Sequence, residues 1–459
     1  MKKDILKILS PTAILGYGYP IESFMAGMAE KPDIIAVDAG SVDPGPYYLG
    51  SGKPFTDRIG VKRDLRCMLK EACLAKIPVV IGTAGGSGAK PHVEWCREII
   101  MEIAREEKIA FRMGIVYADI EKDFVIESIK QGRTEALDGL PELTEKTVME
   151  TKRIVAQMGV SPIIRALEKG CDVVLAGRAY DPSVFAAFPI MLGFDPGLAI
   201  HLGKILECAA IAADPGSGSD AVLGILKKDS FILKTLNKKR KFTALSTAAH
   251  TLYEKTDPCR LPGPGGMIDL SNVTFTELPD GMVEVRGSRF VKSEKNMIKL
   301  EGSRCVGFRT VSFAGTRDPV MISKIESIVN DVRKQVDNLL KAEKTKAELN
   351  VHLYGKNGVM GSWEPGGDEF VPREIAILIE VVAPTQEEAN TVCSITRSSM
   401  LHYGYEGRIS TAGNLAFPFS PSDLQAGEVY EFSIYHLVEI ENESDLFRCE
   451  ILEVNGEEK

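Results

Sequence analysis

A glycine-rich turn follows one of the most apolar runs of the chain and could bind an anion. The run covers residues 77–81, and Gly85, Gly86 and Gly88 lie in the turn after it. Between a buried strand and a helix, the N–H groups of such a turn can hold a phosphate or carboxylate. The spacing matches neither a Walker A loop nor a dinucleotide fingerprint, because Pro91 occupies the third glycine position. The turn therefore predicts either anion binding or only a tight strand-to-helix connection.

Three further turns follow apolar runs and hold polar or aromatic side chains. They contain Tyr17, Asp38, and the pair Arg178 and Asp181. Because the carboxyl ends of parallel strands share one edge, where ligands bind, we expect all four turns to frame one substrate-binding crevice. Arg178 could donate two hydrogen bonds to a substrate carboxylate or phosphate. The alternative is a buried ion pair between Arg178 and Asp181 or another carboxylate.

Four side chains are candidates for acid–base catalysis. Asp38 ends an apolar strand, where a carboxyl group can transfer a proton or cap the next helix. Glu207 lies in an otherwise apolar helix, and burial there would raise its pKa toward that of a general acid. His92 begins the helix after the glycine turn, and His250 is spaced to share a helix face with Tyr253. The spacing of His250 and Tyr253 predicts either a catalytic cluster or a surface hydrogen-bond network.

The histidines and cysteines show no metal-binding spacing. None of the six histidines forms an HxH or HExxH pattern, and the nine cysteines occur singly, without a CxxC pair. Scattered thiols without a secretory leader are typical of a reducing compartment, so we expect a cytoplasmic protein. No cofactor is predicted, although the carboxylates leave a divalent metal ion open.

The elements that must position these residues alternate between short apolar runs and longer helical patterns. The apolar runs cover residues 33–37, 77–81, 110–117 and 172–175. Alternation of this kind predicts βαβ units, and runs that are apolar throughout predict strands covered on both faces. We therefore expect an α/β fold with a mostly parallel, doubly wound sheet.

The last third of the chain has a different pattern. Its expected strands cover residues 305–313, 348–354 and 374–382, and its expected helices cover residues 319–341 and 386–403. Two β-α-β units in succession suggest a C-terminal α+β domain of the ferredoxin-like kind. We place the boundary near residue 293, so that residues 1–293 form the α/β domain with the crevice and residues 294–459 form the α+β domain.

Charge and hydropathy exclude two broad classes of function. The formal net charge of the 459 residues is −9 at pH 7, which disfavours a general nucleic-acid surface. The one basic run, residues 227–241, is read as a solvated face, with a phosphate-binding patch as the alternative. No stretch approaches the roughly 18 apolar residues of a membrane span. We expect no nucleic-acid and no membrane partner.

Several of these motifs together resemble the AtuA family, proteins named for acyclic terpene utilisation. The resemblance rests on the segment 177–181 before a helix, the pair Glu207-Cys208, the turn 214–220 and the segment 252–258. The early turn Thr83-Ala84-Gly85-Gly86 is similar to the Asn-Ala-Gly-Gly turn of the family, with threonine in place of asparagine. The resemblance covers the first two thirds of the chain well and the remainder loosely.

The family resemblance implies an enzyme that acts on a branched carboxylic acid or its acyl-CoA thioester. We expect a lyase of the hydratase or dehydratase type. In this scheme Gly85, Gly86 and Gly88 bind the anionic group, Arg178 orients the carboxylate, and Glu207 or His92 moves the proton.

Other functions stay open at this stage. The main alternative is a non-catalytic ligand-binding or accessory subunit of a degradative enzyme complex. Nucleotide binding is a third, weakened by the failed glycine patterns. The resemblance also implies a small partner subunit, and the apolar strands of the last domain favour a homo-oligomer.

Overall fold

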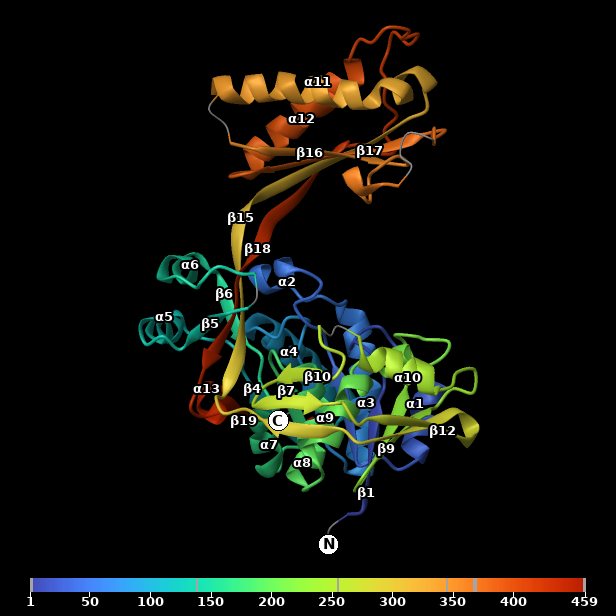
Figure 1. Cartoon of the computed structure of the whole chain (residues 1–459), viewed down its shortest axis with the longest axis vertical. Coiled ribbons are helices and arrows are strands. Elements are labelled where there is room, and N and C mark those ends of the chain that lie inside the picture. The colour runs from blue at the N-terminus through green and yellow to red at the C-terminus, as the bar shows by residue number, and fades with distance from the viewer. Residues whose placement is uncertain (1–2, 138, 254–255, 344–345, 366–369, 457–459) are drawn as a thin grey trace. The chain divides into compact units, whose positions relative to one another are not determined.

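The computed structural model describes residues 3–137, 139–253, 256–343, 346–365 and 370–456. The chain forms two compact units (Figure 1). Unit 1 comprises Met1–Arg304 and Phe432–Lys459, and unit 2 comprises Cys305–Glu431. The chain thus enters unit 2 eleven residues after the boundary placed at 293 and returns to unit 1 at its end.

Unit 1 is built on a mixed sheet of ten strands with a parallel core. The core strands, in spatial order, are β1 (Ile5–Ser10), β2 (Ile34–Asp38), β3 (Val79–Gly82), β7 (Val173–Ala176) and β4 (Phe111–Val116). The flanking strands pair antiparallel and are β8 (Val222–Lys227), β9 (Phe231–Thr235), β13 (Met282–Arg286) and β12 (Thr274–Leu278) on one side and β19 (Cys449–Val454) on the other. The predicted α/β class is confirmed, and the sheet is mixed because antiparallel strands extend both edges.

Helices cover both faces of this sheet because successive strand residues point to opposite sides. Ile35 and Val37 of β2 pack in the core layer that contains α3 (Arg58–Ala75) and α4 (Lys90–Glu107). Ile34 and Ala36 pack in the opposite layer. That layer contains α7 (Val160–Glu168), α8 (Asp181–Met191) and α9 (Pro196–Leu206). Burial of both strand faces explains why the core strands are apolar throughout.

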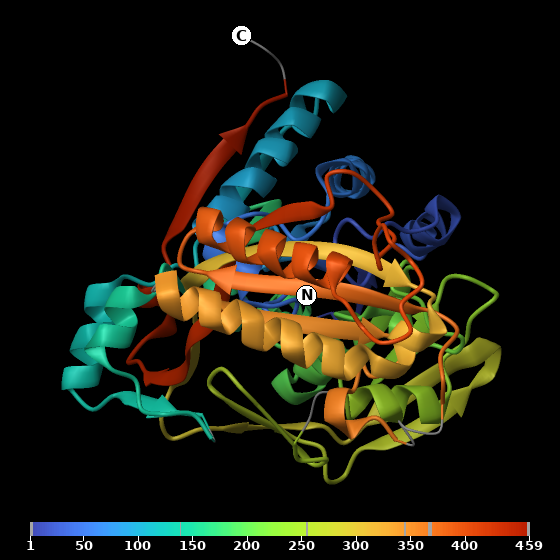
Figure 2. The same ribbon diagram turned by 90° about the horizontal axis from the view of Figure 1, so that it is seen from above.

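Unit 2 places two helices on one face of an antiparallel sheet. Its elements in chain order are β15 (Met297–Thr316), α11 (Pro319–Glu343), β16 (Glu348–Tyr354), β17 (Ile375–Ala383), α12 (Gln386–His402) and β18 (Asp423–Glu439), and the strands lie in the order β16-β17-β15-β18. Residues of β17 alternate between buried and half-buried, and the buried ones pack against α11 and α12. Figure 2 shows the two helices side by side over this sheet.

The first part of β15 and the last part of β18 belong to unit 1. There β15 pairs with β6 (Arg153–Ala156), and β18 pairs with β5 (Thr134–Ala136). The segment of β15 in unit 1 carries Glu301, which is completely buried.

Within the described part of the chain, no helix is long and apolar enough to cross a membrane.

Candidate active site

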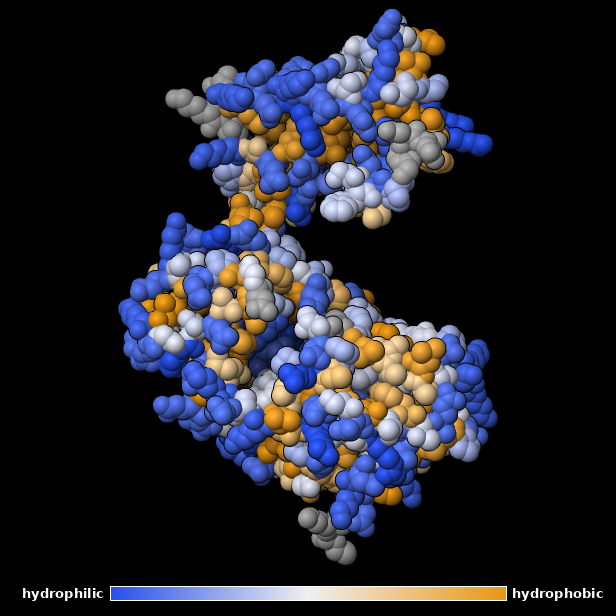
Figure 3. All heavy atoms as spheres, viewed as in Figure 1, coloured by the Kyte–Doolittle hydropathy of each residue, from blue (hydrophilic) through white to orange (hydrophobic). Residues whose placement is uncertain are grey.

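Backbone hydrogen bonds join the four turns at the carboxyl edge of the parallel strands. The N–H of Leu15 donates to the carbonyl of Asp38 at 2.9 Å, and the N–H of Ala39 donates to Gly82 at 3.0 Å. The N–H of Arg178 donates to the carbonyl of Gly88 at 3.1 Å. The space-filling view shows a recess in unit 1 with hydrophilic atoms inside it (Figure 3).

The glycine turn is itself buried and satisfies much of its own hydrogen bonding. Four of its N–H groups donate to backbone carbonyls, namely those of Thr83, Ala84, Gly86 and Gly88. A Cβ atom at Gly88 would lie 2.1 Å from the nitrogen of Arg178, and one at Gly40 would lie 2.6 Å from the carbonyl oxygen of Gly86. These four N–H groups cannot also hold an anion. The geometry therefore supports the second reading of the turn, a close connection that brings neighbouring turns together.

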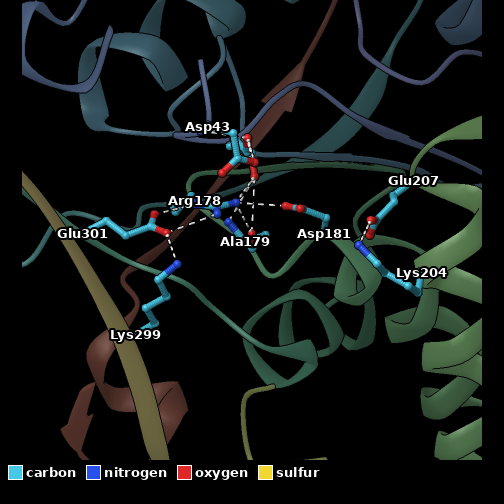
Figure 4. Close-up of polar contacts among 10 residues, drawn as sticks. Asp43, Arg178, Ala179, Asp181, Lys204, Glu207, Lys299 and Glu301 are labelled. Carbon is cyan, nitrogen blue, oxygen red and sulfur yellow. Dashed lines mark hydrogen bonds and ion pairs between the residues drawn. The ribbon is translucent and has the colours of Figure 1, made fainter. Parts of the chain in front are cut away.

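Arg178 lies in a buried ion-pair network. Its Nε donates to Glu301 Oε2 at 2.7 Å and its Nη2 to Glu301 Oε1 at 3.3 Å, while Nη1 donates to Asp181 Oδ1 at 2.9 Å (Figure 4). Burial opposes the charge of Arg178, but Glu301 and Asp181 outweigh it and raise the arginine pKa well above its ordinary value. Burial likewise opposes the Glu301 charge, and Arg178 overcomes this and lowers the glutamate pKa. The structure supports the alternative in which Arg178 forms a buried ion pair with Asp181. Glu301 is a second carboxylate partner of the arginine.

Asp38 is a buried carboxyl group beside this network. It ends β2 and is 6% exposed, and its Oδ1 has no hydrogen-bond partner among the described residues. Burial, followed by the negative charges of Asp181 and Glu207, raises the Asp38 pKa well above its ordinary value, although Arg178 opposes this. A carboxyl group in such surroundings holds its proton to a higher pH than an ordinary aspartate does and can donate it.

A second ion pair lies on the other side of Asp181. Lys204 Nζ is 2.7 Å from Glu207 Oε1, and both side chains are buried. Figure 4 shows Asp181 between Arg178 and this pair. Partial burial raises the Asp181 pKa, and the positive charges of Arg178 and Lys204 offset part of that rise. Asp38, Asp181 and Glu207 thus form a group of carboxyl groups with two cations between them.

His250 lies next to this group on α10 (Ala244–Thr251). Its ring stacks on Tyr253 at a centroid distance of 5.5 Å, and its Nε2 is buried without a hydrogen-bond partner in the described structure. Burial and the nearby charge of Lys204 lower the His250 pKa to about 4, so the ring is neutral at pH 7. Residues 254 and 255, which follow in the motif, lie outside the described residues.

His92 and Tyr17 have other surroundings. The N–H of Ala89 donates to His92 Nδ1 at 3.2 Å, and His92 Nε2 lies 2.9 Å from the carbonyl oxygen of Lys53. Both ring nitrogens are therefore engaged, and burial lowers the His92 pKa to about 4. Tyr17 is 46% exposed and packs against Phe55 at 6.5 Å between ring centroids. The structure thus gives His92 a positioning role at the start of α4 and keeps Tyr17 at the surface.

Three residues of the site were not identified from the sequence. Lys204 could have been found, because a lysine three residues before a glutamate on one helix predicts an ion pair. Glu301 carried no local signal, since it lies 123 residues from Arg178 on a separate strand. Tyr180 follows Arg178 directly, and its buried hydroxyl has no hydrogen-bond partner among the described residues.

The chain was compared with known proteins. The model of the family described as acyclic terpene utilisation family protein AtuA matches residues 60–218 and 224–416, which is more than half of the chain. The protein belongs to the AtuA family. This confirms the resemblance drawn from the motifs and extends it into unit 2. No curated protein and no solved structure matches the chain.

The AtuA match includes Arg178, Asp181, Lys204 and Glu207 and, beyond the gap at residues 219–223, His250 and Glu301. Asp38 lies before the matched region. Within the described residues, no group of three or more histidine, cysteine, aspartate or glutamate side chains could hold a metal ion. Proton transfer by side chains is the chemistry that this arrangement offers most directly.

Proposed function

We propose that this AtuA family protein is a hydratase or dehydratase that acts on a branched carboxylic acid or its acyl-CoA thioester. The observation that carries the proposal is the buried, partnerless Oδ1 of Asp38 at the carboxyl edge of the sheet, with the Lys204–Glu207 pair close by. A carboxyl group whose raised pKa helps it keep its proton, beside another that is paired with a lysine, is suited to moving a proton in each direction. The family description, acyclic terpene utilisation, supports branched hydrocarbon chains as substrates.

In the hydration direction, Glu207 accepts a proton from water while the hydroxide adds to the β-carbon of an unsaturated substrate. Asp38 delivers its proton to the α-carbon, and the proton taken up by Glu207 then returns to Asp38 through solvent, so one water molecule is consumed per turnover. Lys204 stabilises the negative charge that develops on the carbonyl oxygen. Dehydration reverses these steps. The ion pairs of Arg178 hold Asp181 and the turn of residues 177–181 in position, which replaces the direct contact with substrate expected from the sequence.

The test is hydration of a branched, α,β-unsaturated acyl-CoA, measured by loss of the ultraviolet absorbance of the conjugated thioester. We expect turnover by the intact protein and a fall in kcat of about 10²–10⁴-fold in both Asp38→Asn and Glu207→Gln. Asp119→Asn is the matched control, since Asp119 is another strand-end aspartate whose pKa burial raises, with Lys90 and Arg153 as its charged neighbours. Full activity of Asp38→Asn would refute the proposed acid.

The accessory-subunit alternative has a distinct outcome in the same assay. A chain that hydrates no thioester alone, but does so together with a small second polypeptide, would be a subunit of a larger enzyme. The small partner subunit and the homo-oligomer stay predictions. Measuring the native mass of the purified protein, and the masses of the subunits it contains, tests both.

We also interpret unit 2 as a ferredoxin-like sandwich. Its β-α-β-β-α-β order, its strand order β16-β17-β15-β18 and its two helices support this interpretation.

A further inference from the structure

An apolar cavity lies beside the candidate active site within unit 1. Its volume is about 170 Å³. Helices α8 and α9 form part of its wall, and a small antiparallel sheet of β10 (Arg260–Gly263), β11 (Gly266–Asp269) and β14 (Arg289–Lys292) forms another part. The side chains that matter below are Tyr180, Ile190, Ile200, Leu261, Met267 and Phe290.

The size of the cavity limits what it can hold. A protein cavity of about 150 Å³ lined by leucine, isoleucine and phenylalanine binds one benzene molecule, which has six carbon atoms. Pockets for drug-sized ligands are larger, about 300–1,000 Å³. The cavity therefore fits one branched segment of about five or six carbons and cannot enclose a nucleotide or coenzyme A.

Tyr180 connects the cavity to the polar group of Asp38, Asp181 and Glu207. Its ring lines the cavity, while its buried hydroxyl has no hydrogen-bond partner among the described residues. Burial and the charge of Glu207 raise the Tyr180 pKa, so the hydroxyl stays protonated. A Cβ atom at Gly263 would lie 2.9 Å from the Tyr180 ring, so the bare backbone of β10 leaves room for that ring. One side chain thus touches the apolar space with its ring and lies near the catalytic carboxyl groups with its hydroxyl.

We propose that this cavity is the subsite for a branched, five- to six-carbon segment of the acyl chain, with Tyr180 as the wall between that segment and the reacting carbons. The inference rests on the proposed function for the identity of the substrate as an acyl compound. Apolar walls bind a branched alkyl group and exclude charged or hydrated groups. The cavity would therefore select the acyl chain, while the thioester and its coenzyme stay outside.

Binding of saturated thioesters tests the subsite separately from catalysis, because a saturated chain cannot take up water. We expect the protein to bind 6-methylheptanoyl-CoA, whose saturated chain has a branched segment of five carbons beyond the β-carbon, at least about tenfold more tightly than acetyl-CoA, measured by isothermal titration calorimetry. Ile200→Phe fills the cavity and should abolish this preference without weakening the binding of acetyl-CoA. Met267→Ala enlarges the cavity and should shift the preference toward 8-methylnonanoyl-CoA, which has a saturated branched chain two carbons longer.

Ile205→Val is the matched control, because Ile205 is buried on the same helix but does not line the cavity. It should leave the ratio of the two affinities unchanged. Circular dichroism establishes that each variant folds, and Met267→Ala decides the matter if Ile200→Phe does not.

The two proposals fail in different ways. Hydration activity together with equal affinities for 6-methylheptanoyl-CoA and acetyl-CoA would overturn the subsite alone. A preference that moves with Ile200→Phe or Met267→Ala, in a protein without hydratase activity, would uphold the subsite and overturn the reaction.

Discussion

At the scale of single residues, the candidate site separates carboxyl groups into two kinds. Glu301 is completely buried, but the bidentate contact with Arg178 keeps it ionised. Asp38 is nearly as buried and has no such partner on Oδ1, so its pKa rises. Burial without a paired cation favours the neutral acid, and burial with one favours the carboxylate. The partners of each carboxyl group, rather than its depth alone, therefore assign the roles.

The raised pKa of Asp38 predicts how stability changes with pH. The folded protein holds this proton more tightly than the unfolded chain does, so the contribution of Asp38 is largest in acid. It is lost as the pH rises from the ordinary aspartate pKa toward the raised one. Relative to Asp38→Asn, which stays neutral, the intact protein should lose up to about 1.4 kcal/mol of unfolding free energy per pH unit in that window. Urea unfolding at a series of pH values measures the difference.

A second aspartate supplies a control of opposite sign. The side chain of Ser271, followed by its backbone N–H, hydrogen-bonds to Asp269 and lowers the pKa of that carboxyl. The contribution of Asp269 to the unfolding free energy is present above the ordinary aspartate pKa and is lost as the pH falls. The difference between the intact protein and Asp269→Asn should therefore change in acid, in the opposite direction. A flat difference for Asp38→Asn across the whole range would contradict the assignment of a raised pKa.

At the scale of elements, the turn between β3 and α4 determines how closely neighbouring turns approach. Thr83, Gly85, Gly86 and Gly88 all have positive φ angles. At Gly88 the requirement is also steric, because the backbone of Arg178 leaves no room for a side chain. The turn thus contacts the backbone of Arg178 directly and helps to position it.

Gly88→Ala should destabilise unit 1 well beyond the cost of an unfavourable φ. Gly170→Ala is the matched variant, because Gly170 has φ +76° against +66° at Gly88 but has no atom within 4 Å of the added Cβ. We expect about 1–2 kcal/mol for Gly170→Ala and about 1–3 kcal/mol more for Gly88→Ala, through overpacking. In a Trp363→Phe background, Trp95 on α4 is the remaining tryptophan, and its fluorescence during urea unfolding reports on unit 1. Equal losses in both variants would show that the close approach to Arg178 is unimportant.

At the scale of the whole molecule, the chain leaves unit 1, forms unit 2 and returns to finish unit 1. The returning segment ends in β19, which pairs with β4 along six residue pairs, and Val454 packs into the core with 3% exposure. Strand β4 also pairs with β7, whose following turn carries Arg178. Residues 449–454 therefore complete one edge of the sheet that supports the site.

Truncation after Arg448 should expose the edge of β4 to solvent. Hydrogen–deuterium exchange followed by mass spectrometry should show faster exchange of residues 111–116, because their hydrogen bonds to β19 are lost. The amides of β17 in unit 2 should exchange at their original rate. Glu453→Ala is the control, since that side chain is 77% exposed and the strand stays in place. Unchanged protection of residues 111–116 would show that β19 adds little to this sheet.

Local patterns in the sequence determined the α/β class, the turns that meet at the carboxyl edge of the sheet and the family, because periodicity and turn chemistry depend on neighbouring residues. The tertiary structure decided the partners of the buried groups. Arg178 meets Glu301 across 123 positions, and His92 meets the carbonyl of Lys53 across 39. Long-range packing selects such partners, and a buried charge or ring nitrogen cannot be assigned a role until they are known. For this reason the sequence predicted which turns meet at one edge of the sheet, but it assigned Arg178 a ligand where the fold pairs it with a carboxylate.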